Sequence, residues 1–122
     1  VRVCEYANIS PQPELPCVGG PSPVGTHPRG SSWTDAHDLA GNVAEWVFDW
    51  YDAAYYADPL SSVLPTGPAT GTRRVVRGGG FRSGILDCST TRRSAAPPDS
   101  SSDEIGFRCA LSIDAPDPAG AR

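Results

Sequence analysis

The sequence lacks any apolar stretch long enough to cross a bilayer, and it contains neither methionine nor lysine. A transmembrane helix needs about 20 predominantly apolar residues, so we predict no membrane span. No signal-peptide core is present either. Because the chain does not begin with methionine, we expect a fragment or a processed chain. Arginine supplies all 10 basic residues, and together with abundant alanine, glycine and proline this indicates a bacterial protein from a GC-rich genome.

A surplus of positive charge is also missing, because the net charge is −4. A protein that follows a nucleic-acid backbone needs a basic surface, and acidic residues and glycines interrupt the arginines of the second half. We therefore predict no nucleic-acid partner. The 122 residues suffice for one small domain. The 13 glycines and 13 prolines disfavour long helices and favour short strands joined by ordered loops.

Alternation of apolar residues predicts three short strands. The first covers residues 41–51, where four residues at period two share one face: Ala44, Trp46, Phe48 and Trp50. A helix remains the alternative there, because another set of its apolar residues shares a helical face. The second strand covers residues 73–77. The third covers residues 105–113, and its alternation places Cys109 on a buried face.

The four cysteines show no CxxC spacing, which argues against a zinc ribbon or a thioredoxin motif. An even number is typical of two disulfides in an exported protein, and four reduced thiols in a cytosolic protein are the alternative. Cys4 and Cys17 bracket a proline-rich segment that a short disulfide-closed loop would order. Four cysteines allow three pairings.

Three further motifs differ in how strongly they indicate a binding site. The glycines at 78–80 lack the spacing of a dinucleotide fingerprint and are more typical of a strand end where two backbones approach closely. His27 and His37 have no third ligand at a helical spacing, so we predict no zinc site. Asp38 and Glu45 bracket a glycine-containing bend, and hard oxygen ligands at this density suit Ca²⁺. An ordinary surface pair of carboxylates is the alternative.

Seven blocks in order resemble the formylglycine-generating enzyme, or sulfatase-modifying factor, family: ANI at 7–9, PVGTHP at 23–28, DLAGNVAEWVFDWY at 38–51, PTGPATG at 65–71, RVVRGGGF at 74–81, RRSAAPPD at 92–99 and IGFRC at 105–109. The resemblance implies an α+β fold with little regular secondary structure. This fold is a variant of the C-type lectin fold with short antiparallel strands and long ordered loops. We expect residues 1–113 to be the C-terminal part of such a domain, followed by a disordered tail at 114–122.

The resemblance also implies bound calcium. The family ligands match four positions, the first two by side chain and the last two by backbone carbonyl: Asp38, Glu45, Gly41 and Val43. A second family site would combine the Asn8 side chain and the Ile9 carbonyl with an acidic residue. The matching stretch at 16–18 holds no acidic residue.

Family members that make formylglycine oxidise a sulfatase cysteine with O₂, and they use two cysteines that bind Cu(I). Counted forward from the glycines, these positions fall on Ser83 and Cys88, whereas a count backward from RSAAPPD matches Cys88 with a structural residue. At most one thiol is present, and one thiol cannot hold Cu(I) linearly, so we predict no copper. Gly80 replaces the serine of the family's RGGS block, and Arg93 matches an arginine of the substrate groove.

We therefore predict a degenerate, calcium-binding member that recognises an unidentified peptide, protein or small-molecule ligand. Family relatives called variable proteins use the same fold for ligand display without chemistry. Whether this chain is an enzyme stays open. The alternative is an O₂-using, metal-dependent oxidoreductase, formylglycine-generating or non-haem iron, whose catalytic residues lie in a missing N-terminal part.

Nothing in this chain supplies the histidine-rich iron site of the family branch that makes carbon–sulfur bonds. Among the three cysteine pairings we expect Cys4–Cys17 and Cys88–Cys109. An oxidised state of this kind predicts a periplasmic or extracellular protein, and a cytoplasmic location is the alternative.

Overall fold

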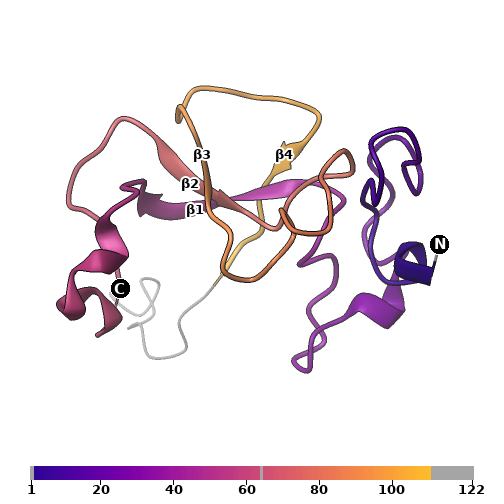
Figure 1. Cartoon of the computed structure of the whole chain (residues 1–122), viewed down its shortest axis with the longest axis horizontal. Helices are drawn as coiled ribbons and strands as arrows, with labels where there is room; N and C mark the ends of the chain where they lie inside the picture. Colours follow the sequence, from indigo (N-terminus) through magenta and orange to yellow (C-terminus); the bar gives the residue numbers. More distant parts are fainter. Residues whose placement is uncertain (1, 64, 111–122) are drawn as a thin grey trace, which may run out of the picture.

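A small four-stranded sheet lies at the centre of the chain and long loops surround it (Figure 1). The structure is a computed structural model that describes residues 2–63 and 65–110. In sheet order the strands are β3 (Ser94–Ala96), β2 (Arg74–Arg77), β1 (Ala44–Trp50) and β4 (Ile105–Gly106). The β3–β2 and β2–β1 pairs are antiparallel, and β1 pairs with β4 in parallel. Short 3₁₀-helices are the other regular elements: η1 (Arg2–Glu5), η2 (Pro28–Gly30), η3 (Tyr55–Ala57) and η4 (Pro59–Ser62).

The two central strands follow from their side chains. Val75 and Val76 in β2 are β-branched, which favours an extended backbone, and both are buried. β1 pairs through Trp46 with Val76 and through Trp50 with Arg74, and an irregularity between these two pairs bends the strand. The predicted strands at 41–51 and 73–77 are therefore confirmed, and so is the prediction of little regular secondary structure.

The N-terminal segment is fastened beside the beginning of β1 (Figure 1). The Asn42 backbone N–H donates to the Asn8 carbonyl at 2.7 Å, and the Ser10 N–H donates to the Ser83 carbonyl at 2.9 Å. Ile9 and Phe81 are each 1% exposed and complete the small core with Ala7, Val75 and Val76. The core therefore joins three distant segments at the point where β1 begins.

The predicted strand at 105–113 is wrong within the described residues. Only Ile105–Gly106 pairs, with Ala44 and Glu45 of β1, and the chain then leaves the sheet. Phe107 is 77% exposed and Cys109 is also exposed, so the predicted buried face does not form there. Alternation indicates two faces but not what covers either of them. Residues 111–113 of that strand, and the predicted tail at 114–122, lie outside the described residues.

The structure contains one of the two expected disulfides. Cys4 and Cys17 are bonded, with 5.4 Å between their Cα atoms. Cys88 and Cys109 are free thiols, so the expected second bond is absent. The neighbours of Cys109, Arg108 and Ala110, line the same hollow as Cys88. Cys109 itself is exposed and is not among the residues that line this hollow.

Within residues 2–63 and 65–110, no helix combines the length and the apolar character that a membrane crossing requires.

Candidate functional site

The segment from Asp38 to Glu45 curls tightly because three of its residues adopt left-handed backbone angles. The φ angles are 53° at Asp38, 78° at Gly41 and 64° at Asn42. Gly41 is needed there for two reasons. Its φ angle is positive, and a Cβ would lie 2.4 Å from the Asn8 carbonyl oxygen. The Asn42 amide is buried and its Oδ1 accepts a 2.8 Å hydrogen bond from the Ser22 N–H. The loop is therefore held against the N-terminal segment.

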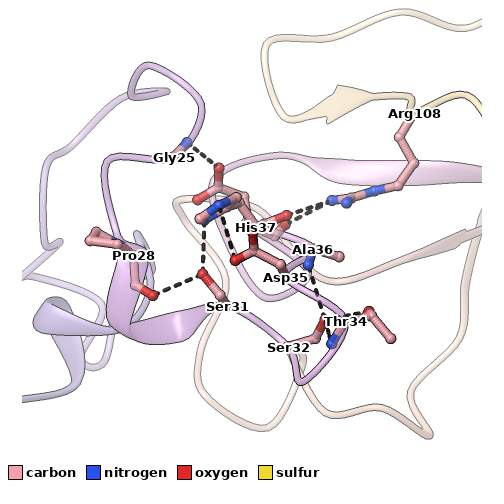
Figure 2. A network of polar contacts seen from close by, with 10 residues as sticks. Gly25, Pro28, Ser31, Ser32, Thr34, Asp35, Ala36, His37 and Arg108 are labelled. Carbon is pink, nitrogen blue, oxygen red and sulfur yellow. Dashed lines mark hydrogen bonds and ion pairs between the residues drawn. The ribbon is translucent and has the colours of Figure 1, made fainter.

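Both carboxylates of this loop already have partners. Asp38 Oδ2 accepts a hydrogen bond of 2.7 Å from the Gly25 N–H. Both carboxylate oxygens of Glu45 accept hydrogen bonds from the Arg108 guanidinium, which also donates to the His37 carbonyl at 3.0 Å. Figure 2 shows Arg108 reaching His37 from the opposite side to Gly25. The hydrogen bonds to Glu45 raise the pKa of Arg108 above its usual value.

This loop has the donor chemistry of a calcium site. Ca²⁺ takes hard oxygen ligands from carboxylates and carbonyls, and the loop offers two carboxylates and the carbonyls of a tight bend. Among the described residues no group of three or more His, Cys, Asp or Glu side chains is close enough to hold a metal. A calcium ion here would thus depend on carbonyls to complete its shell. It would also have to share Glu45 with Arg108.

The second predicted calcium site has a different environment. The Ile9 carbonyl accepts a 2.9 Å hydrogen bond from the Cys17 N–H, so the disulfide-closed loop occupies that acceptor. Asn8 is 1% exposed and donates through its amide to the Gly20 carbonyl at 2.8 Å. Its Oδ1 has no hydrogen-bond partner, which leaves one buried oxygen unsatisfied. Of the two oxygens predicted for this site, Asn8 Oδ1 is thus the one without a hydrogen-bond partner.

Ser83 and Cys88 lie side by side against Gly79. A Cβ built on Gly79 would lie 2.6 Å from Cys88 Sγ and 3.2 Å from Ser83 Oγ, so both side chains face the same point. Ser83 Oγ accepts a 2.9 Å hydrogen bond from the Gly80 N–H, which closes a tight turn. Burial raises the pKa of the Cys88 thiol, and a backbone hydrogen bond from Gly41 opposes that shift. The forward count from the glycines thus names two residues that meet in space.

The glycine turn borders a cavity of about 310 Å³. Charged and polar side chains line it on both sides of Gly80: Arg77, Ser83, Asp87, Arg92 and Glu104. Arg93, the arginine predicted for the groove, is not among its lining residues. Its guanidinium lies over the rings of Tyr51 and Tyr56 and donates to the Asp52 carbonyl at 3.1 Å.

Arg92 and Arg108 are the functional candidates that the sequence interpretation missed. Arg92 stands next to Arg93 in the sequence, but only Arg92 of the two lines the cavity. Arg108 belongs to the IGFRC block, so its presence was visible, but its partner Glu45 is 63 residues away.

A second hollow of about 630 Å³ adjoins the glycine turn at Gly78. It is mostly apolar and also contains the thiol of Cys88: its walls include Leu39, Trp46, Phe48, Cys88, Arg108 and Ala110. Phe48 is 84% exposed, so this hollow is open to solvent. The two hollows share Arg77 and Gly78 at their boundary.

Comparison with known proteins gives a consistent result. The sequence profile of the sulfatase-modifying factor enzyme 1-like domain matches residues 17–113. A formylglycine-generating enzyme of Streptomyces coelicolor is 43% identical over 97 residues, which are 75% of this chain and 31% of that protein. The serine/threonine-protein kinase Pkn1 of Chlamydia trachomatis is 38% identical over 93 residues, which are 75% of this chain and 15% of the kinase.

A solved structure is similar as well. Treponema denticola variable protein 1 matches 87% of this chain and 36% of its own chain, with a TM-score of 0.70 and 28% sequence identity. The present chain therefore spans about a third of the length of the formylglycine-generating enzyme and of the solved structure that it matches.

Proposed function

Because this chain belongs to the sulfatase-modifying factor family and has its variant of the C-type lectin fold, we propose that it binds calcium and a ligand but does not make formylglycine. The observation that carries the proposal is the contact of Ser83 and Cys88 with Gly79. Where the chemistry of the family needs two thiols, this chain presents one thiol and one hydroxyl.

A thiol and a hydroxyl do not fit Cu(I). Copper(I) is a soft ion that prefers thiolate sulfur, and a hydroxyl is a hard oxygen donor with a much higher pKa than a thiol. The Ser83 hydroxyl also has another task, because it accepts the Gly80 N–H and closes the turn. We therefore assign Ser83 to the turn beside the cavity and expect no copper-binding pair at Ser83 and Cys88.

The cavity beside Gly80 supports a ligand-binding role. Its lining includes the positively charged Arg92, the negatively charged Glu104 and the glycines of the turn. A few charged groups of both signs in a concave site suit a peptide, whose backbone and side chains supply complementary groups. The ligand that we propose is thus a peptide or protein segment.

Copper titration tests the missing pair. Under anaerobic, reducing conditions the wild-type chain should show no tight, thiolate-dependent binding of Cu(I). The Ser83→Cys variant should bind one equivalent, because it places a second thiol beside Cys88. Ser102→Cys is the matched control, since it adds a thiol to the same cavity at another wall. One equivalent of Cu(I) bound by the wild type and lost in Cys88→Ser would overturn the proposal.

Calcium titration tests the other half. When calcium binds the folded chain and not the unfolded one, it raises the melting temperature. We expect this rise in the wild type and its loss in Asp38→Asn, which removes a charged oxygen ligand. Asp35→Asn is the control, because this carboxylate is exposed and lies three residues before the loop. An equal rise in Asp38→Asn and the wild type would refute this site.

A second candidate function comes from the relatives named formylglycine-generating enzymes. Because this chain spans 31% of the Streptomyces protein, residues outside it could complete an O₂-using oxidoreductase, copper- or iron-dependent. The test is the longer gene product, incubated with O₂ and a cysteine peptide of a sulfatase. Formylglycine detected by mass spectrometry would favour this second candidate, and its absence the first.

The Cys4–Cys17 bond supports a periplasmic or extracellular location, because such bonds persist in oxidising compartments. Thiol labelling of the protein taken directly from intact cells tests this placement. We expect Cys4 and Cys17 to resist labelling until a reductant is added.

A further inference from the structure

The guanidinium of Arg108 lies in a cage of oxygen atoms. Two of them are the carboxylate oxygens of Glu45, and the others are the carbonyl oxygens of His37 at 3.0 Å and Asp38 at 3.4 Å. A carboxylate and carbonyls around one positive charge are the surroundings that a calcium ion also prefers. The cage therefore already holds a cation, supplied by the chain itself.

We propose that Arg108 and a divalent cation compete for Glu45, so that the loop alternates between a guanidinium-closed state and a cation-loaded state. This proposal rests on the proposed function, because it concerns the same loop. The calcium ligands implied by the family resemblance do not include Arg108, and they do not include the His37 and Asp38 carbonyls that Arg108 contacts. The competition is thus a property that the structure of this chain assigns to Arg108.

The contacts between Arg108 and Glu45 oppose a second cation. Arg108 uses Nε for one oxygen of Glu45 and Nη2 for the other, so neither oxygen is left without a charged partner. A calcium ion bound to Glu45 would place a double positive charge within a few ångströms of the guanidinium. Arg108 would leave Glu45 when calcium arrives.

The two nearby carboxylates have hydrogen-bond or ion-pair partners of their own, and Asp38 acts on Arg108 through its charge. The Asp38 carboxylate accepts the Gly25 N–H, and Asp35 faces the His37 ring at 3.8 Å. The His37 ring contacts Ser31 Oγ through Nδ1 at 2.8 Å. Figure 2 shows this polar network on the side of His37 away from Arg108. Release from Glu45 would therefore send Arg108 toward solvent.

The exchange has a structural consequence beyond the loop. Arg108 follows β4 by two residues and ties the segment after β4 to the beginning of β1. It also forms one wall of the 630 Å³ hollow, together with Ala110. Cation binding would release the Arg108 side chain from Glu45 and so widen the hollow beside Phe48. Calcium would thus control access to an apolar binding surface.

Calcium titration of an Arg108→Gln variant tests the competition. Isothermal titration calorimetry should show calcium binding roughly tenfold tighter than in the wild type, because the variant removes the hydrogen bonds of a charged group. Arg29→Gln is the matched control, since it breaks the Arg29–Glu5 ion pair at a distant site and should bind calcium as the wild type does. Equal or weaker binding by Arg108→Gln would overturn the proposal.

The outcomes separate this proposal from the proposed function. If Arg108→Gln binds calcium and the wild type does not, the competition stands and calcium binding by the wild type falls. If both bind alike, calcium binding stands and the competition falls. If neither binds, both fall.

A second measurement does not depend on Arg108→Gln, in case that variant does not fold. The Arg108 Nε–H should give a resolved nuclear magnetic resonance signal, because it is hydrogen-bonded to Glu45. We expect this signal to be lost as calcium saturates the protein or, if the wild type binds none, to persist until Glu45→Gln removes its partner. A signal that persists in calcium-saturated wild-type protein would overturn the proposal.

Discussion

Gly79 is the residue that lets the Ser83 and Cys88 side chains meet. Its φ angle is 68°, and a Cβ would lie 2.6 Å from Cys88 Sγ. Both the backbone conformation and the space therefore exclude a side chain. We predict that Gly79→Ala lowers the free energy of unfolding by about 2 kcal/mol in urea denaturation.

Gly84→Ala is the control for this prediction. It lies in the same loop without a positive φ, and the nearest atom to its Cβ would be 3.8 Å away. A loss in Gly84→Ala as large as that in Gly79→Ala would show that the loop tolerates no side chain at all. The special role assigned to Gly79 would then be wrong.

The Cys88 thiol should react slowly with alkylating reagents. Burial raises its pKa, the nearby Asp87 carboxylate adds to that rise, and together they outweigh the Gly41 hydrogen bond. The thiolate is the reactive form, so at a given pH less of Cys88 is reactive than of an ordinary cysteine. We predict that iodoacetamide at pH 8 labels exposed Cys109 first, as followed by mass spectrometry.

Raising the pH should increase the labelling of Cys88, because deprotonation follows its raised pKa. The same labelling in guanidinium chloride removes burial and should make the two thiols react alike. Faster labelling of Cys88 than of Cys109 in the folded protein would contradict this account.

At the scale of elements, the Cys4–Cys17 disulfide replaces packing that a proline-rich segment cannot provide. It closes a loop with a sequence separation of 13, and the Cys17 N–H donates to the Ile9 carbonyl inside that loop. A disulfide that closes a loop of this size lowers the entropy of the unfolded chain and thereby stabilises the folded state by about 3 kcal/mol. We predict that the double variant Cys4→Ser, Cys17→Ser loses about this much unfolding free energy.

The control for the disulfide is Cys109→Ser, because Cys109 is an exposed free thiol. Its effect in the same urea denaturation should stay within about 0.5 kcal/mol, as is usual for exposed positions. An unchanged denaturation midpoint in the double variant would show that the N-terminal segment is held by the core alone.

The strands show what local pattern predicts well. Period-two alternation identified β1, and the β-branched pair Val75 and Val76 identified β2. The same alternation failed beyond Gly106, where Phe107 is exposed. Alternation depends only on neighbours in the chain, whereas pairing depends on a partner strand elsewhere. β4 is short because it pairs with β1 only at Ala44 and Glu45.

At the scale of the whole molecule, the described residues form an open apolar hollow on the surface. Leu39, Trp46 and Phe48 line it, and Phe48 is 84% exposed. Exposed apolar patches of this kind attract apolar partners. We predict that the chain enhances the fluorescence of the dye ANS, and that Phe48→Ser weakens dye binding several-fold because it removes an aromatic wall.

Val24→Ser is the matched control for the dye experiment. Val24 is as exposed as Phe48, but it is not among the walls of the hollow. Equal loss of dye binding in the two variants would place the dye elsewhere. The apolar hollow would then have no role in binding.

The sequence by itself determined the family, the positions of β1 and β2 and the glycine turn, and it led us to expect the pairing of Cys4 with Cys17. Each of these rests on local pattern or on short separations along the chain. Tertiary structure alone decided that Arg92 rather than Arg93 lines the cavity, that Cys88 and Cys109 are not bonded, and that Arg108 contacts Glu45 across 63 residues. The physical reason is that sheet register and burial choose the partner of a side chain, and both depend on segments that are distant in the sequence.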